Sequence, residues 1–199
     1  MKLPRTPHLP DSPGGTRDDR RLPDLNIFLG RRVVITEKMD GSSVCLTRKN
    51  LYARSHAGPP RHPSFDLLKA RRAALDIPGE MAIYAEWLHA VHSIKYPSLD
   101  DYLQVFAIVE RGKVIDWSST MVMCDEMGLT TVPMLYDGLL PKNLEPYACS
   151  RREGFVARFR DSFPLAEWDK NVAKWVRAGH VQTDEHWSHG AWEKNGLAN

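Results

Sequence analysis

The chain has 199 residues, 42% of them hydrophobic and 26% charged, which is typical of one globular domain with enough apolar side chains for a core. It contains no apolar run that would span a bilayer and no signal peptide at its start, so we expect no membrane partner. The net charge of +2 argues against a protein that coats nucleic acid non-specifically, although a neutral protein can still carry a local cationic groove. Three cysteines without metal-binding spacing indicate free thiols in a reducing compartment, and hence a cytoplasmic protein.

The first 24 residues contain five prolines and a Gly-Gly pair, and this spacing excludes a helix or a central strand. Two interpretations remain open. The segment is either a disordered tail or an extended arm laid over the domain, with His8, Leu9 and the Asp18–Asp19 pair as its fixed contacts. We therefore divide the chain into a Pro-rich N-terminal arm, residues 1–24, and a domain, residues 25–199.

After residue 31 the sequence changes to short runs of β-branched and apolar residues. Three of them, at 33–36, 44–47 and 51–54, are separated by Asp40-Gly41 and Lys49-Asn50, which are residues typical of turns. We predict that the three runs form a hairpin or meander.

The rest of the chain alternates between strand and helix signals. Ser64 is expected to cap a helix that ends before Pro78-Gly79, and Ser118 or Ser119 to cap one that ends near Gly128. Further strands are expected at 81–87, 103–109, 114–117, 132–136, 154–159 and 171–176, with a short irregular helix between 141 and 149. Mostly antiparallel strands with helices between them define an α+β fold.

The first candidate for chemistry is the segment Glu37-Lys38-Met39-Asp40-Gly41. A lysine at the end of a strand, just before a tight turn, can direct its amine into a cleft, and the amine is a nucleophile once it is deprotonated. Desolvation or neighbouring cations favour that deprotonation. Taken alone, the segment is equally well explained as a turn beside a solvated lysine.

Four later segments follow this lysine along the chain. They are Tyr84-Ala85-Glu86, Val105-Phe106-Ala107-Ile108, Glu153-Gly154-Phe155-Val156-Ala157-Arg158 and Val172-Ala173-Lys174-Trp175. Between Arg32 and Arg177 the series resembles the covalent nucleotidyltransferase superfamily, which contains ATP-dependent DNA ligases, RNA ligases and mRNA capping enzymes. It is most similar to the compact ATP-dependent RNA ligases of phages and bacteria.

The resemblance implies an α+β nucleotidyltransferase domain with mostly antiparallel sheets, flanking helices and an ATP-grasp-like ligase architecture. It also implies an ATP-dependent polynucleotide ligase that acts on RNA. AMP would pass from ATP to Lys38 and then to a 5′-phosphate end, from which a 3′-hydroxyl would displace it. The implied cofactors are ATP and Mg²⁺ or Mn²⁺, and the implied partners are RNA ends, with a DNA acceptor left open.

The resemblance assigns a role to each residue that matches a motif. Lys38 would attack the α-phosphate, and Lys174 would neutralise that phosphate and ease the deprotonation of Lys38. Glu86 would accept hydrogen bonds from the ribose hydroxyls, and Phe106 would stack on the adenine. Glu153 would bind the divalent metal ion.

Four further residues have supporting roles in this hypothesis. Glu37 would hold the edge of the base, and Arg54 would contact the nucleotide or the acceptor strand. Asp40 would orient Lys38 and stabilise the turn. The family usually has two lysines at alternate positions on its last motif strand; here only Lys174 matches, and Arg177 would substitute for the second.

The resemblance also bears on the domain organisation. Many relatives carry an OB-fold or a helical domain after the catalytic domain, and the residues that follow Arg177 are too few for either. We therefore expect no OB-fold, and either a stand-alone catalytic domain or an accessory protein that replaces the missing domain. The arm, with His8 and Arg17, would then form part of the nucleic-acid surface.

Histidines offer a competing metal site. Four side chains near the C-terminus have the chemistry of metal ligands: His180, Asp184, His186 and His189. Their spacing fits no standard zinc pattern, so a structural role or one at the substrate edge is favoured. Three others are expected to line the cleft without a catalytic role: His89, His92 and Lys95.

Three alternatives to an RNA ligase stay open. A guanylyltransferase of the mRNA-capping type would take GTP in place of ATP. A non-catalytic nucleic-acid-binding module of the same fold would bind RNA without using Lys38. A metal hydrolase built on the histidines would hold zinc and would stay active without Lys38.

Overall fold

Strands dominate the fold, which a computed structural model describes for residues 2–15, 18–54, 58–180 and 192–198. The strands are β1 (Arg32–Lys38), β2 (Ser42–Thr47), β3 (Leu51–Ala53), β4 (Met81–Trp87), β5 (Leu103–Glu110), β6 (Lys113–Val114), β7 (Thr130–Thr131), β8 (Met134–Leu139), β9 (Gly154–Phe159), β10 (Phe163–Pro164) and β11 (Val172–Val176). The helices are α1 (Asp66–Ala74), α2 (Trp117–Glu126) and α3 (Trp168–Asn171), with 3-10 helices at Asn26–Phe28, Pro63–Phe65, Glu145–Tyr147 and Leu165–Glu167. Within these residues, no helix has the length and apolar character needed to cross a membrane.

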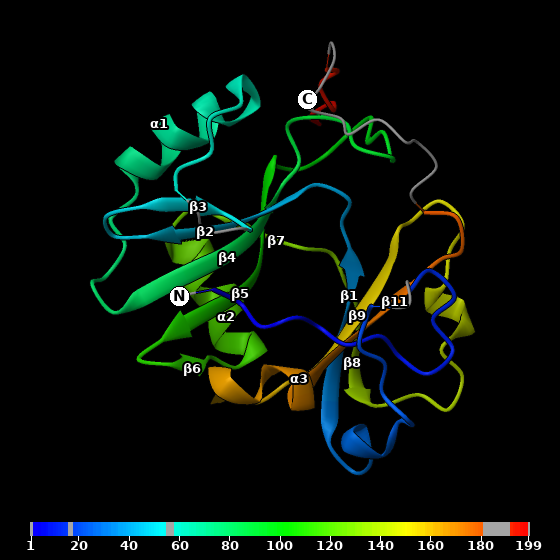
Figure 1. The fold of residues 1–199 in the computed structure, drawn as a ribbon. Coiled ribbons are helices and arrows are strands. Elements are labelled where there is room, and N and C mark those ends of the chain that lie inside the picture. The colour runs from blue at the N-terminus through cyan, green and yellow to red at the C-terminus, as the bar shows by residue number, and fades with distance from the viewer. Residues whose placement is uncertain (1, 16–17, 55–57, 181–191, 199) are drawn as a thin grey trace.

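The described strands form two sheets, the first on the right of Figure 1 and the second on the left. The first sheet has the strand order β11–β9–β1–β8, and the second has the order β10–β6–β5–β4–β2–β3, with β7 parallel to β5. The other strand pairs are antiparallel. Leu68 of α1 and Cys124 of α2 belong to the same apolar cluster as β2, β4 and β5, so these two helices pack on the second sheet. The α+β class expected from the sequence is confirmed.

The turn at Asp40-Gly41 does not close the expected hairpin. β1 pairs with β8 and β9 in the first sheet, whereas β2 pairs with β3 and β4 in the second. The reason lies in the run Val33-Val34-Ile35, which is buried on both faces and therefore suits a central strand between two neighbours. The turn instead carries the chain from one sheet to the other. The second predicted hairpin, β2 with β3, is confirmed.

Other strands lie at or near their predicted positions, but β6 and β8 are shifted from the predicted 114–117 and 132–136, β7 and β10 were not predicted, and the helices differ too. β4 and β9 have the expected bounds, and β5 is one residue longer. The side chain of His62, rather than Ser64, caps the helical turn before α1, and Asp116, rather than a serine, caps α2. Helix α3 was not expected, and the irregular helix between 141 and 149 is reduced to one 3-10 turn. The three cysteines are free thiols, as expected.

The described part of the N-terminal arm, blue in Figure 1, lies along the edge of β11 that does not pair with β9. The N–H of Leu9 donates to the carbonyl of Lys174 (2.8 Å), and the N–H of Lys174 donates to the carbonyl of Pro7 (2.9 Å). Leu9 is completely buried and His8 is 2% exposed. Of the two interpretations, the extended arm is therefore correct for these residues, and it covers an otherwise unpaired strand edge. Arg17 lies outside the described residues.

Candidate active site

Lys38 lies at the end of β1, on one face of the first sheet. In the register of that sheet Lys38 pairs with Gly154 of β9, while Val156 of β9 pairs with both Thr36 and Lys174. Residues directly opposite each other, and residues two positions apart on a strand, share a face. Lys38 and Lys174 therefore project from the same face of the sheet.

Glu153 contacts Lys38 directly. It immediately precedes β9, and its Oε1 lies 2.5 Å from the Nζ of Lys38. The residue is only 6% exposed. Its neighbour Gly154 has no room for a side chain, because a Cβ there would lie 1.9 Å from the backbone oxygen of Trp175 on β11. This close approach of β11 holds the start of β9, and with it Glu153, beside Lys38.

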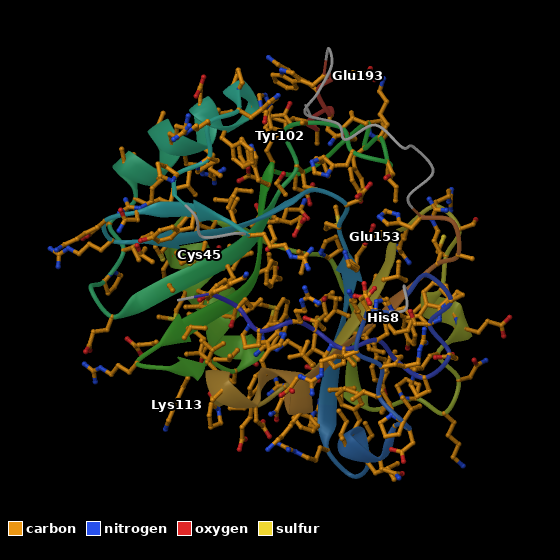
Figure 2. All side chains as sticks on the ribbon, in the orientation of Figure 1. His8, Cys45, Tyr102, Lys113, Glu153 and Glu193 are labelled. Atoms are coloured by element: carbon orange, nitrogen blue, oxygen red, sulfur yellow. The ribbon has the colours of Figure 1, made fainter. Side chains whose placement is uncertain are left out.

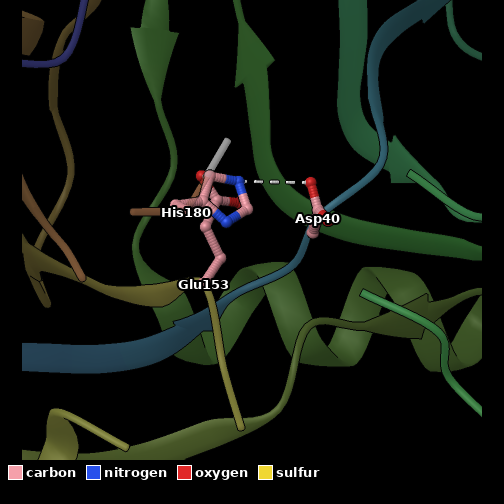
Figure 3. A group of neighbouring side chains, drawn as sticks. All are labelled: Asp40, Glu153 and His180. Atoms are coloured by element: carbon pink, nitrogen blue, oxygen red, sulfur yellow. Dashed lines mark ion pairs between the residues drawn. The ribbon is translucent and has the colours of Figure 1, made fainter. Parts of the chain in front are cut away.

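His180 forms a cluster with Asp40 and Glu153 (Figure 3). Its Nε2 lies 3.2 Å from Oε1 of Glu153 and 3.4 Å from Oδ1 of Asp40. The sequence placed this histidine in a structural or substrate-edge role, because the C-terminal histidines match no metal motif. The fold places it against Asp40 and Glu153, and its role stays a prediction. The other C-terminal candidates lie outside the described residues: Asp184, His186 and His189.

Asp40 is anchored by the loop that follows β4. Its Oδ2 accepts hydrogen bonds from the N–H groups of Ser93 (2.8 Å) and Ile94 (2.7 Å), and its own N–H donates to the hydroxyl of Tyr96 (2.9 Å). Burial raises the pKa of the Asp40 carboxyl, but the bond from His180 and the two amide bonds outweigh burial and lower the pKa below its usual value. Asp40 is therefore a fixed carboxylate.

Glu86 reaches the site from β4 of the second sheet. Burial raises the pKa of its carboxyl to about 8, against the attraction of Lys38, and the charges of Glu153 and Asp40 raise it further. The N–H of Gly41 donates a hydrogen bond to it. These interactions place Glu86 in the same electrostatic cluster as Lys38, although the two residues belong to different sheets.

Lys174 is a partly buried cation on β11. Burial lowers the pKa of its ammonium group, Asp19 opposes that change, and the positive charges of Lys38 and Arg54 reinforce it. No ion pair joins Lys174 to any of the residues that the structure describes. A partly buried ammonium without an ion pair in the described part of the chain is suited to bind an anionic ligand.

Three other predicted residues have surroundings of their own. Phe106 of β5 is partly buried against apolar clusters that contain residues of both sheets. Arg54 follows β3 directly and is exposed. Arg177 donates its backbone N–H to the carbonyl of Glu153 (3.0 Å). Their roles toward a nucleotide stay predictions.

Glu37 has a partner of its own. It alternates with Lys38 along β1 and so projects from the opposite face, where its Oε2 lies 2.8 Å from Nε of Arg152. Burial raises the pKa of its carboxyl, and Arg152 acts against that rise. The predicted contact of Glu37 with the base edge stays a prediction, and it would have to compete with this ion pair.

The residues expected to line the cleft also have local partners. Nδ1 of His89 lies 3.0 Å from the carbonyl of Ser64, and Nε2 of His92 lies 3.3 Å from Oγ of Ser42. Lys95 forms an ion pair with Glu193. These contacts join the loop after β4 to Ser64 before α1, to β2 and to the C-terminal residue Glu193.

The cluster of Asp40, Glu153 and His180 has a donor set that fits a divalent cation. One ligand atom from each residue lies within 4.8 Å of the other two. Mg²⁺ prefers carboxylate oxygens, whereas Mn²⁺ also accepts imidazole nitrogen. Two carboxylates and one histidine therefore suit Mn²⁺ at least as well as Mg²⁺. Binding would require Glu153 to exchange its contact with Lys38 for the metal.

Comparison with known proteins gives a family match and similar folds. The family model described as RNA ligase matches residues 31–176. An archaeal ATP-dependent RNA ligase has a similar structure, with a TM-score of 0.58 and 16% identity over 89% of this chain and 48% of that one. A Naegleria gruberi RNA ligase with ATP and Mn has a TM-score of 0.56 and 13% identity, over 92% of this chain and 58% of that one. The chain thus spans about half the length of these structures, and no curated protein sequence matches it.

Proposed function

This chain belongs to the RNA ligase family, and from that premise we propose that it is an ATP-dependent RNA ligase with a nucleotidyltransferase fold. It joins 5′-phosphate and 3′-hydroxyl ends through a lysyl-AMP on Lys38. The observation that carries the proposal is the position of Lys38 at the end of β1, in contact with Glu153 and on the same face as Lys174, which forms no ion pair within the described part of the chain.

The first step forms the covalent intermediate. The deprotonated Nζ of Lys38 attacks the α-phosphorus of ATP, the N–P bond forms, and pyrophosphate leaves with the electron pair of the broken P–O bond. Glu153 lies close enough to Lys38 to take its proton before it exchanges that contact for the metal. Lys174 neutralises the charge that gathers on the phosphoryl oxygens.

The remaining residues position the nucleotide. Glu86 accepts hydrogen bonds from the ribose hydroxyls, and Phe106 stacks on the adenine. Asp40, Glu153 and His180 would hold Mg²⁺ or Mn²⁺, which neutralises phosphate charge when it is bound.

Two transfers complete the reaction. An oxygen of the RNA 5′-phosphate attacks the phosphorus of lysyl-AMP, and Lys38 leaves and recovers its proton. The 3′-hydroxyl of the second end then attacks the activated 5′-phosphorus, loses its proton and displaces AMP. The product is a phosphodiester bond.

The intact mass of the protein after incubation with ATP and Mg²⁺ or Mn²⁺ tests the proposal. We expect a gain equal to one AMP, reversed by added pyrophosphate and absent from Lys38→Ala. Lys113→Ala is the matched control, because Lys113 is exposed on β6 of the second sheet (Figure 2). A folded, unmodified wild-type protein that gains no adduct would refute the lysyl-AMP mechanism. An adduct with GTP alone would assign the guanylyltransferase alternative.

A further inference from the structure

Residues 192–198 lie along the loop that joins β4 to β5, residues 88–102, near the top of Figure 1. We call residues 192–198 the clasp. Isolated β-bridges connect the clasp to the loop at two places, Ala90 with Lys194 and Leu99 with Leu197. The clasp lies outside residues 31–176, which the RNA ligase model matches. Its contacts are therefore a feature of this chain that the family assignment does not explain.

Asn195 anchors the clasp and is 2% exposed. Its Nδ2 donates to the carbonyls of Leu88 (2.7 Å) and Ala90 (3.3 Å), and its backbone N–H donates to the carbonyl of His89 (3.1 Å). Its Oδ1 accepts a hydrogen bond from the N–H of Tyr96 (2.8 Å). Because the side-chain amide uses both its donor and its acceptor, its removal would leave buried backbone groups without partners.

The neighbouring Gly196 holds Tyr96 from the other side. Its N–H donates to the carbonyl of Tyr96 (2.8 Å). Gly196 also passes so close to the loop that a Cβ would lie 2.1 Å from the oxygen of Pro97, an approach that only glycine permits. Asn195 and Gly196 together thus bind the N–H and the carbonyl of Tyr96, and they fix its backbone.

Tyr96 in turn contacts Asp40 of the candidate active site. Its hydroxyl accepts a hydrogen bond from the backbone N–H of Asp40 (2.9 Å). Two other residues of the same loop, Ser93 and Ile94, donate to Oδ2 of Asp40. Oδ2 is thereby engaged, and Oδ1 is the oxygen that lies 3.4 Å from Nε2 of His180. The loop therefore determines which carboxylate oxygen is directed at the candidate metal cluster.

A metal ligand depends on the groups that orient it. Loss of such a group typically lowers metal affinity by about 10- to 100-fold. Asp40 is oriented by the loop, and the loop is held by the clasp. Only Tyr96 lies between Asn195 and Asp40 on this path, so a change at Asn195 can alter the position of Asp40 through a single residue.

We propose that Asn195 is a positioning residue for the reaction. It fixes Tyr96 and the loop of residues 88–102, which orient the Asp40 carboxylate toward a divalent cation. This inference rests on the proposed function and extends it beyond the matched residues 31–176. A chain that keeps every motif residue but loses the contacts of Asn195 binds its metal ion more weakly.

Calorimetric titration with Mn²⁺ tests the proposal in protein without bound nucleotide. Asn195→Asp keeps an oxygen for Tyr96 but replaces Nδ2 with an oxygen that faces two carbonyls, and we expect Mn²⁺ affinity to fall by about tenfold or more. Asn171→Asp is the matched control, because Asn171 is also buried and donates its Nδ2 to a carbonyl, that of Glu167 (2.6 Å). It should keep wild-type affinity even where its thermal stability is lower.

Tyr96→Phe tests the last step of the path, because it removes only the hydroxyl that accepts the N–H of Asp40. It should weaken Mn²⁺ binding in the same direction as Asn195→Asp. Tyr136→Phe is its control, since that hydroxyl donates to the carbonyl of Leu139 on β8. If Asn195→Asp does not fold, Tyr96→Phe decides the question. Absence of Mn²⁺ binding by wild type, or wild-type affinity in the folded variants, would overturn the proposal.

The rate of lysyl-AMP formation as a function of Mn²⁺ concentration separates positioning from a general loss of stability. Asn195→Asp should need more Mn²⁺ for its half-maximal rate and should approach the wild-type rate when Mn²⁺ is saturating. A purely structural defect would lower the active fraction without changing the concentration required, and that result would also refute the proposal. A wild type that forms no lysyl-AMP, but whose Mn²⁺ affinity depends on Asn195, would contradict the ligase and leave the positioning role intact.

Discussion

Glu86 predicts a pH dependence of stability whose sign and size follow from the structure. Its pKa rises from 4.5 to about 8 on folding, mainly through burial. Between these two pH values the folded state binds more protons at this site than the unfolded state, so the free energy of unfolding falls as the pH rises. The full shift corresponds to about 5 kcal/mol, lost once the pH exceeds 8. Glu86→Gln keeps a neutral group of the same shape and should remove this loss.

The assay is urea unfolding of wild type and Glu86→Gln at a series of pH values from 5 to 9. As the pH rises, the free energy of unfolding of wild type should fall by several kcal/mol relative to that of Glu86→Gln, because only wild type has to ionise Glu86. The titration of other groups largely cancels between the two proteins. Glu126→Gln, on the exposed face of α2, is the control and should show a constant difference. A wild-type–Glu86→Gln difference that does not change with pH would refute the assignment of a partly buried carboxyl with a raised pKa.

Three further predictions concern the arm, the start of β9 and the metal cluster. Leu9 has no exposed surface, so Leu9→Ala should cost about 2–5 kcal/mol in chemical denaturation; a cost near zero would contradict a packed arm. Gly154→Ala would place a Cβ 1.9 Å from the oxygen of Trp175. The substitution should lower the free energy of unfolding by about 1–3 kcal/mol and slow lysyl-AMP formation. A wild-type stability and a wild-type rate would show that β11 moves away without cost. His180→Ala should weaken Mn²⁺ binding by about tenfold or more in calorimetry, and unchanged affinity would remove His180 from the metal site.

Local patterns predicted strands well and strand pairing poorly. β4 follows Pro78-Gly79 and β9 begins at Gly154, so the starts of these two strands follow from turn residues in the sequence. Asp40-Gly41 has the chemistry of a hairpin turn, but a turn signal does not say whether the strands on either side pair with each other. The uninterrupted apolar run Val33-Val34-Ile35 was the signal that β1 is buried on both faces.

The site was predictable only where its residues match motifs. The contact of Lys38 with Glu153 depends on the register of β1 and β9, which a single sequence does not state. His180 enters the site because the chain turns after β11 at Gly179, whose φ of +61° allows that bend. The ordered arm was undecidable from composition, because its stability comes from contacts with the domain, namely backbone hydrogen bonds to β11 and the burial of Leu9.

The segment from Lys38 to Gly41 connects the two sheets, which its sequence motif alone does not indicate. Lys38 ends β1 in the first sheet, and the Asp40 carboxylate accepts hydrogen bonds from two backbone N–H groups of the loop after β4. Gly41 then passes so close to the second sheet that a Cβ would lie 2.7 Å from the oxygen of Trp87 and 3.2 Å from Cγ of Glu86. Only glycine permits that approach. Four consecutive residues thus join the two sheets at the point where Lys38 of one sheet and the Glu86 carboxyl of the other interact electrostatically.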